Sequence, residues 1–213
     1  MDILEIKDNM IDSASSFIDT AFKEGLCGIP IANTVVSLGK IILSWREQKL
    51  LEDTQRFLSE FDEGTIDPNK LKKYRDKLKS GDASVAKELD RVLRVLSLAA
   101  DAEKAIYLAR ALRSYIAEQI DRQRFLTFIA VIHGLFLEDL LALIELYEKD
   151  VAEKSEDGYA ILSEDECSIR LSSLGLLYLQ MGTRLRDLEN GSTYYKITQL
   201  GKSFTEQILF ADK

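Results

Sequence analysis

The chain contains few of the residues that carry common catalytic and metal-binding chemistry. Its 213 residues include one histidine, His133, and two cysteines, Cys27 and Cys167. A single histidine excludes a paired-histidine metal site, and the cysteines match no metal or redox spacing. His133 stands in an apolar stretch, which favours a core or groove histidine over a catalytic base. Acidic residues precede Cys167 and disfavour its thiolate. Because the two cysteines lie far apart in sequence and match no such spacing, we expect both to be reduced in a cytoplasmic protein.

Proline and glycine are also scarce. Two prolines and eleven glycines leave long stretches free to form helices. Hydrophobic residues make up 46% of the chain and charged residues 30%, which argues against general disorder. The N-terminus has no basic segment followed by an apolar run, so we expect no secretory signal.

No motif for catalysis or cofactor binding is visible. The glycines of residues 25–39 are spaced too loosely for a phosphate loop, and no Gly-Lys-Ser/Thr follows them. Asp101 with Glu103, and Glu138 with Asp139, are typical of helix starts or surface pairs, whereas general acid–base catalysis needs a shared cleft. The sequence therefore predicts no enzymatic activity, no metal and no cofactor.

The chain is acidic, with 36 acidic against 28 basic residues and a net charge of −8. Nucleic acid and anionic lipid repel such a chain unless it gathers its basic residues on one face. One segment departs from this balance and indicates either a solvated helix face or a docking surface for an acidic partner or phosphates. Its basic residues include Lys70, Lys72, Lys73, Arg75 and Lys77. Tyr74 is its only aromatic residue, so base stacking has little support.

The N-terminal part is predicted to be helical. Apolar residues recur at helical spacing over 3–22, and Pro30 can open a second helix that ends near Phe61. Residues 26–45 are the most hydrophobic part of this half, but a membrane span needs about 20 predominantly apolar residues. Lys40 would be costly within a bilayer. We expect a buried core helix, with a membrane-active segment as the alternative.

Further helices are predicted from capping residues and apolar stripes. The helix over 125–146 is apolar nearly all round, which is typical of the buried central helix of a bundle. It would hold Glu138 and Asp139 near its middle. Four aspartates are placed to start helices: Asp67 (followed by Pro68), Asp82, Asp101 and Asp121.

The C-terminal part is predicted to mix helix and strand. The polar residues 150–158 indicate a linker, and Ser163 with Glu166 forms a capping box. The elements that follow are a helix ending at Gly175, strands over 176–181 and 194–197, and a helix over 198–210. The fold class is therefore mainly α, with a helical bundle over 1–150 and a small α+β unit over 151–213.

Two segments carry a resemblance to a known family. Leu-Ser-Ser-Leu-Gly-Leu-Leu at 171–177 and Tyr-Tyr-Lys-Ile-Thr-Gln-Leu-Gly-Lys-Ser-Phe at 194–204 resemble the end of a bacterial winged helix. In that family a recognition helix finishes in such a turn, and a two-stranded wing and a further helix follow. The resemblance implies a winged-helix-like domain over 151–213.

The residues at the matching positions weaken the DNA-binding expectation. A recognition helix meets phosphates and base edges with basic or amide side chains. This one has Arg170 alone against three acids, Glu164, Asp165 and Glu166, and acids follow Arg184 and Arg186 of the wing. We therefore expect a winged helix that contacts protein or is purely structural.

A second resemblance covers the helical block 101–140. This block resembles uncharacterised helical proteins of bacteria, some of them met near phage and mobile elements. The resemblance implies a bacterial source more than any activity.

These observations predict a non-enzymatic intracellular interaction or scaffold protein that acts through helix-mediated contacts or self-association. The alternatives are a winged-helix transcription regulator and a membrane-perturbing effector, for example in phage defence, that exposes residues 26–45. A protein partner is expected, nucleic acid is disfavoured by charge, and a membrane is not expected. The candidate partner-binding residues are Lys70, Lys72, Lys73, Arg75, Lys77, Arg184 and Arg186.

Overall fold

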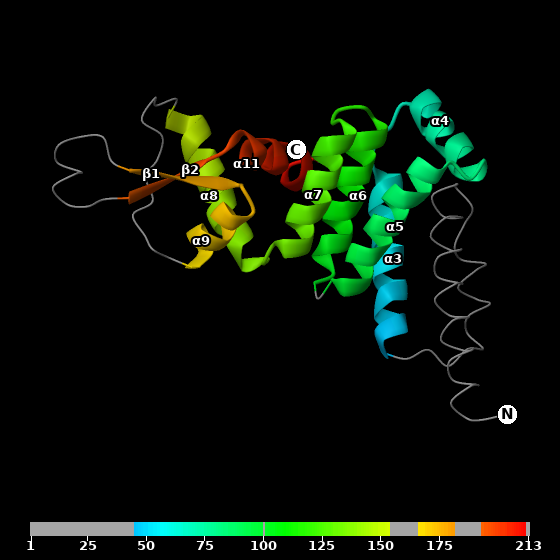
Figure 1. Ribbon diagram of the computed structural model, residues 1–213, viewed down its shortest axis with the longest axis horizontal. Coiled ribbons are helices and arrows are strands. Elements are labelled where there is room, and N and C mark those ends of the chain that lie inside the picture. Colours follow the sequence, from blue (N-terminus) through cyan, green and yellow to red (C-terminus); the bar gives the residue numbers. More distant parts are fainter. Residues whose placement is uncertain (1–44, 100, 154–165, 182–192, 212–213) are drawn as a thin grey trace. The chain divides into compact units, whose positions relative to one another are not determined.

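The chain is mainly α-helical, as the sequence predicts, with one small antiparallel sheet among the residues that the structure describes. The computed structural model describes residues 45–99, 101–153, 166–181 and 193–211 (Figure 1). The chain forms two compact units, one ending at Ile129 and the other beginning at Ala130. The predicted domains, 1–150 and 151–213, divide the chain at another point. Compact units do not by themselves define domains, so the predicted domain bounds stay a prediction.

The first unit is built from helices that share one apolar core. They are α3 (Trp45–Glu63), α4 (Pro68–Lys79), α5 (Ala83–Leu98), α6 (Glu103–Ile116) and the first part of α7 (Arg122–Gly134). α3 lies along α6 (Figure 1). The rings of Tyr115 and Phe125 stack with their centroids 4.7 Å apart. The fully buried side chains of this unit include Phe57, Leu89, Leu96, Leu108, Leu112, Phe125 and Phe128.

Three of the four predicted helix starts are confirmed. The carboxylates of Asp67, Asp82 and Asp121 accept hydrogen bonds from backbone N–H groups two or three residues later, at 2.7–3.3 Å. Such bonds satisfy amides that have no partner within the helix. Asp101 is not a cap, because Ala102 holds the N-cap position of α6 without a side-chain bond. The Asp101 carboxylate instead lies 3.9 Å from Lys104 Nζ.

The single helix predicted over 125–146 is wrong. α7 ends at Gly134, and α8 (Glu138–Glu153) begins four residues later. Glycine is a poor helix former, and a Cβ at Gly134 would lie 2.8 Å from Leu174 Cδ2. Glu138 and Asp139 occupy the first turn of α8, where carboxylates interact favourably with the helix dipole. They therefore start a helix instead of interrupting one.

The second unit combines helices with a two-stranded sheet. After α8 come α9 (Glu166–Ser173), β1 (Leu177–Met181), β2 (Thr193–Ile197), α11 (Gln199–Phe204) and a π-helical turn over Thr205–Leu209 (Figure 1). β1 and β2 are antiparallel, with Leu177 opposite Ile197 and Met181 opposite Thr193. Both predicted strands and the last helix are confirmed. The relation of this order of elements to winged-helix proteins stays a prediction.

Two glycines allow the tight packing of this second unit. Gly175, at φ +74°, terminates α9 in a backbone conformation that side chains with a Cβ rarely adopt. A Cβ at Gly201 would clash with the carbonyl oxygen of Leu176. The core of the unit then closes around Leu171, Leu176, Leu177, Ile197, Phe204 and Ile208.

Several predictions fall wholly or partly outside the described residues. They are the helix over 3–22, the segment 26–45 apart from Trp45, the capping box at Ser163, and the wing arginines Arg184 and Arg186. The linker prediction is wrong for residues 150–153, which continue α8; its remaining residues are not described. No described helix is long and apolar enough to cross a membrane.

Candidate functional site

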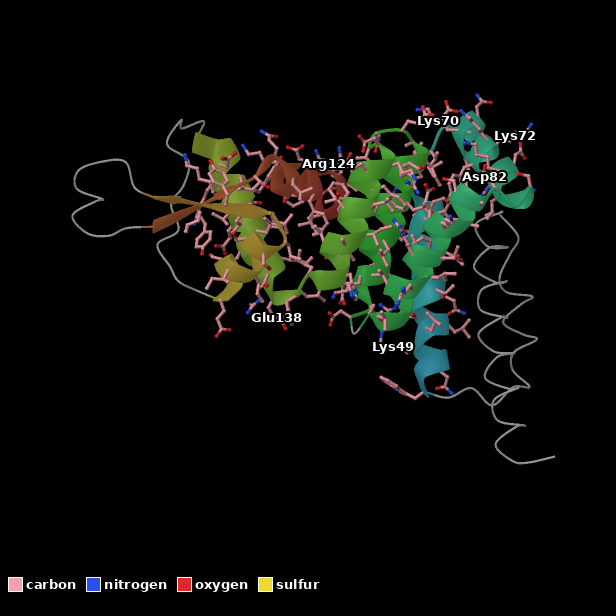
Figure 2. The ribbon with its side chains drawn as sticks, viewed as in Figure 1. Lys49, Lys70, Lys72, Asp82, Arg124 and Glu138 are labelled. Atoms are coloured by element: carbon pink, nitrogen blue, oxygen red, sulfur yellow. The ribbon has the colours of Figure 1, made fainter. Side chains whose placement is uncertain are left out.

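The basic segment singled out in the sequence forms α4 and carries most of its cations outward. Lys72, Lys73 and Lys77 are exposed, whereas Lys70 and Arg75 are half-buried. Figure 2 shows Lys70 and Lys72 on this helix. Within the described part of the chain, Lys72, Lys73 and Lys77 form no ion pair.

Lys70 differs from the other lysines of α4 because its ammonium group already binds groups at the end of α6. Its Nζ donates a hydrogen bond of 2.7 Å to the backbone carbonyl of Ala117 and lies 3.1 Å from a carboxylate oxygen of Glu118. Both acceptors follow the last turn of α6, where unpaired carbonyls concentrate negative charge. The hydrogen bond from Lys70 lowers the pKa of Glu118 below its ordinary value. Lys70 thus fastens α4 to the C-terminal end of α6.

A small pocket of about 140 Å³ lies at this junction. Lys70, Lys73, Tyr74 and Lys77 line it from α4, and Tyr115, Ile116 and Glu118 line it from the end of α6. Lys73 and Lys77 are exposed and form its rim, while Tyr74 is 8% exposed and belongs to its floor. Of the five described candidate residues, the structure brings Lys70, Lys73 and Lys77 together here, and Lys72 and Arg75 are not part of it.

A buried carboxylate that the sequence analysis missed lies on α5. Glu88 is fully buried, and its Oε1 accepts hydrogen bonds from Arg122 Nε at 2.6 Å and from the Tyr115 hydroxyl at 3.3 Å. Among the described residues, Glu88 Oε2 and the Tyr74 hydroxyl are the buried side-chain atoms without a hydrogen-bond partner. Burial, and then the charge of Glu88, raise the pKa of Tyr74 well above its usual range. A glutamate one position before Leu89 of the apolar stripe was the available signal.

A buried ion pair of the second unit involves Asp139. With Glu138 this residue lies in the first turn of α8, which confirms the expected helix-start pair, but it is 1% exposed and not a surface residue. Its carboxylate accepts two hydrogen bonds from Arg170, one of them 2.8 Å long from Nε. The Arg170 guanidinium also lies 5.2 Å from the centre of the Phe136 ring. The one basic residue of the predicted recognition helix, Arg170, is therefore bound to a carboxylate of its own unit.

The histidine and one of the two cysteines lie among the described residues. His133, expected in the core or a groove, is exposed on α7 and is therefore not a core residue. Cys167 is half-buried on α9 and forms no disulfide, while Cys27 lies outside the described residues. In the described ranges, no three His, Cys, Asp or Glu side chains come close enough to hold a metal ion.

Large apolar side chains are exposed on neighbouring elements of the second unit, and sequence periodicity did not reveal them. Each is at least 45% exposed: Phe136, Leu141, Ile169, Tyr178 and Leu179. α9 lies against both α8 and β1, so three adjoining elements contribute to this set. On α9 the exposed positions are Glu166, Ile169 and Ser173, which lie on one helix face.

Comparison of the chain with protein-family models, with curated proteins and with solved structures finds no match.

Proposed function

We propose that the protein is a non-enzymatic interaction protein whose second unit binds a protein partner through the outward face of α9. The observation that carries the proposal is Ile169, a large apolar side chain that is 52% exposed in the middle of this helix. Exposed apolar patches mark contact sites in many soluble proteins. Leu141 and Leu179, on the adjoining α8 and β1, are exposed as well.

The charges of α9 support a protein partner over DNA. Affinity for DNA comes largely from lysine and arginine contacts to phosphates. Glu166 is almost fully exposed on the face that also carries Ile169, and the guanidinium of Arg170 is bound to Asp139. A duplex would meet a carboxylate and an isoleucine at this face, whereas a protein surface can bury the isoleucine.

The proposal also accommodates the resemblance to winged helices. In that comparison α9 takes the place of the recognition helix, which is the element that winged-helix proteins present to a partner. Replacing basic residues by apolar and acidic ones on the same face changes the class of partner without changing the fold. A buried aromatic or aliphatic anchor typically contributes more to such an interface than the polar residues around it.

A photo-crosslinking amino acid at position 169 tests the proposal in the cells that make the protein. We expect a protein adduct of defined mass from position 169 and none from the exposed position 90 on α5, which serves as the control. The mass of the adduct distinguishes a second copy of this chain from another protein. Equal adducts from both positions, adducts to nucleic acid alone, or no adduct at position 169 would each contradict the proposal.

A further inference from the structure

From the pocket between α4 and the end of α6, we infer a binding site for a single phosphate group, free or carried by a small organic molecule. Lys73 and Lys77 supply the charge, and Tyr74 and Ile116 line the interior. The site lies in the first unit and does not depend on the protein contact proposed for the second unit.

The charges that line the pocket match a phosphate dianion. Lys70 and Glu118 neutralise each other across 3.1 Å. Lys73 and Lys77 are left with two positive charges and no ion pair among the described residues. A phosphate monoester carries between about −1.5 and −2 charges at neutral pH. Residues four apart on a helix share a face with about 6 Å between their Cβ atoms, so both ammonium groups can reach the oxygens of one phosphate.

Lys70 makes the pocket suitable for an anion even though a helix C-terminus adjoins it. The final carbonyls of α6 would repel a phosphate through the helix dipole. The ammonium of Lys70 donates to the carbonyl of Ala117 and so offsets this repulsion at the edge of the pocket. The arrangement separates a positioning lysine, Lys70, from the two lysines available to a ligand.

The size and burial of the pocket define what can enter it. A volume of about 140 Å³ is that of a few water molecules, at roughly 30 Å³ each. One phosphate and the first atoms attached to it fit such a space. Tyr74 and Ile116 are buried, so ion pairs at this rim have water on fewer sides than ion pairs on an open helix face.

The test is a titration of the full ¹⁵N-labelled chain at low ionic strength with inorganic phosphate and, separately, ribose 5-phosphate. We expect saturable shifts at the amides of Lys73, Lys77 and Ile116. Tighter binding of ribose 5-phosphate would indicate an organic phosphate, and equal binding would indicate free phosphate; either result supports the site. Lack of saturable binding of both probes would overturn it.

Matched double variants separate this pocket from general attraction to a basic helix. Lys73→Gln with Lys77→Gln is expected to weaken binding by at least about tenfold, because charge-assisted hydrogen bonds to phosphate are lost. Lys72→Gln with Lys79→Gln removes the same charge from exposed positions of the same helix that do not line the pocket. We expect this control to change the affinity by less than about twofold. Equal weakening by the two variants, or binding of heparin without binding of phosphate, would contradict a defined site.

Discussion

In the first unit, buried or nearly buried glutamates accept hydrogen bonds from arginines, and the lysines of α4 face solvent. In the second unit, the arginine of α9 is the group committed to a buried carboxylate, and apolar side chains face solvent instead. The first unit therefore gathers exposed lysines on α4, whereas the second exposes apolar side chains on α8, α9 and β1. The first unit also exposes two large apolar side chains, Trp45 and Leu98. The contrast shows that the net charge of a chain is a poor guide to its surface, because charges paired in the interior are counted in it but are not available at the surface.

The largest expected effect separates two residues of α9 that lie two positions apart. Leu171 is fully buried and Ile169 is 52% exposed. Leu171→Ala should lower the free energy of unfolding by about 3 kcal/mol, because it removes buried methyl groups and leaves a cavity. Ile169→Ala should change it by less than about 0.5 kcal/mol. Urea denaturation followed by circular dichroism measures both, and comparable losses would mean that Ile169 is not a surface residue.

The corresponding test in the first unit concerns the ion pairs between α3 and α6. Glu60 Oε1 lies 2.8 Å from Arg110 Nε and 3.6 Å from Arg113 Nη1, and all three side chains are largely buried. Glu60→Gln keeps the volume of the side chain and removes its charge. We expect a loss of about 2 kcal/mol of unfolding free energy, since two poorly solvated guanidinium groups lose their carboxylate.

Glu63→Gln is the matched control for that change. Glu63 ends the same helix but is exposed, and within the described ranges its carboxylate accepts a single hydrogen bond, 3.3 Å long, from the Ser59 hydroxyl. A change below about 0.5 kcal/mol is expected here. If Glu60→Gln were equally silent in urea denaturation, the buried ion pairs would not be what joins α3 to α6.

Much of the fold was predictable because the relevant forces act between residues close in sequence. Asp67 and Asp82 cap helices through amides two or three residues away, and both strands begin and end within one residue of their predicted bounds. The break between α7 and α8 was missed because hydrophobic periodicity continues across it. Gly134 and the acidic pair Glu138–Asp139 were the local signals of a helix end and a new helix start at this point.

The candidate sites were less predictable than the helices. The lysines of α4 are evident in the sequence, but the partner that commits Lys70 lies 47 residues later, at Ala117. The pairing of Arg170 with Asp139 spans 31 residues in the same way. Which basic residues remain available to a ligand is therefore a property of tertiary packing, and residue spacing alone does not contain it.

The smallest expected effect tests whether Lys70 binds the end of α6 or is available to bind a ligand. The hydrogen bond from Lys70, followed by its charge, lowers the pKa of Glu118 in the folded protein. This interaction therefore contributes to stability above the ordinary pKa of a glutamate, and the contribution is lost as the pH falls through the lowered value. Lys70→Gln should return the pKa of Glu118 to its ordinary range in an NMR titration, whereas Lys73→Gln should raise it less. An unchanged pKa in Lys70→Gln would mean that Lys70 is not bound to the end of α6 in solution, and Lys70 would then join Lys73 and Lys77 as a cation available to the phosphate.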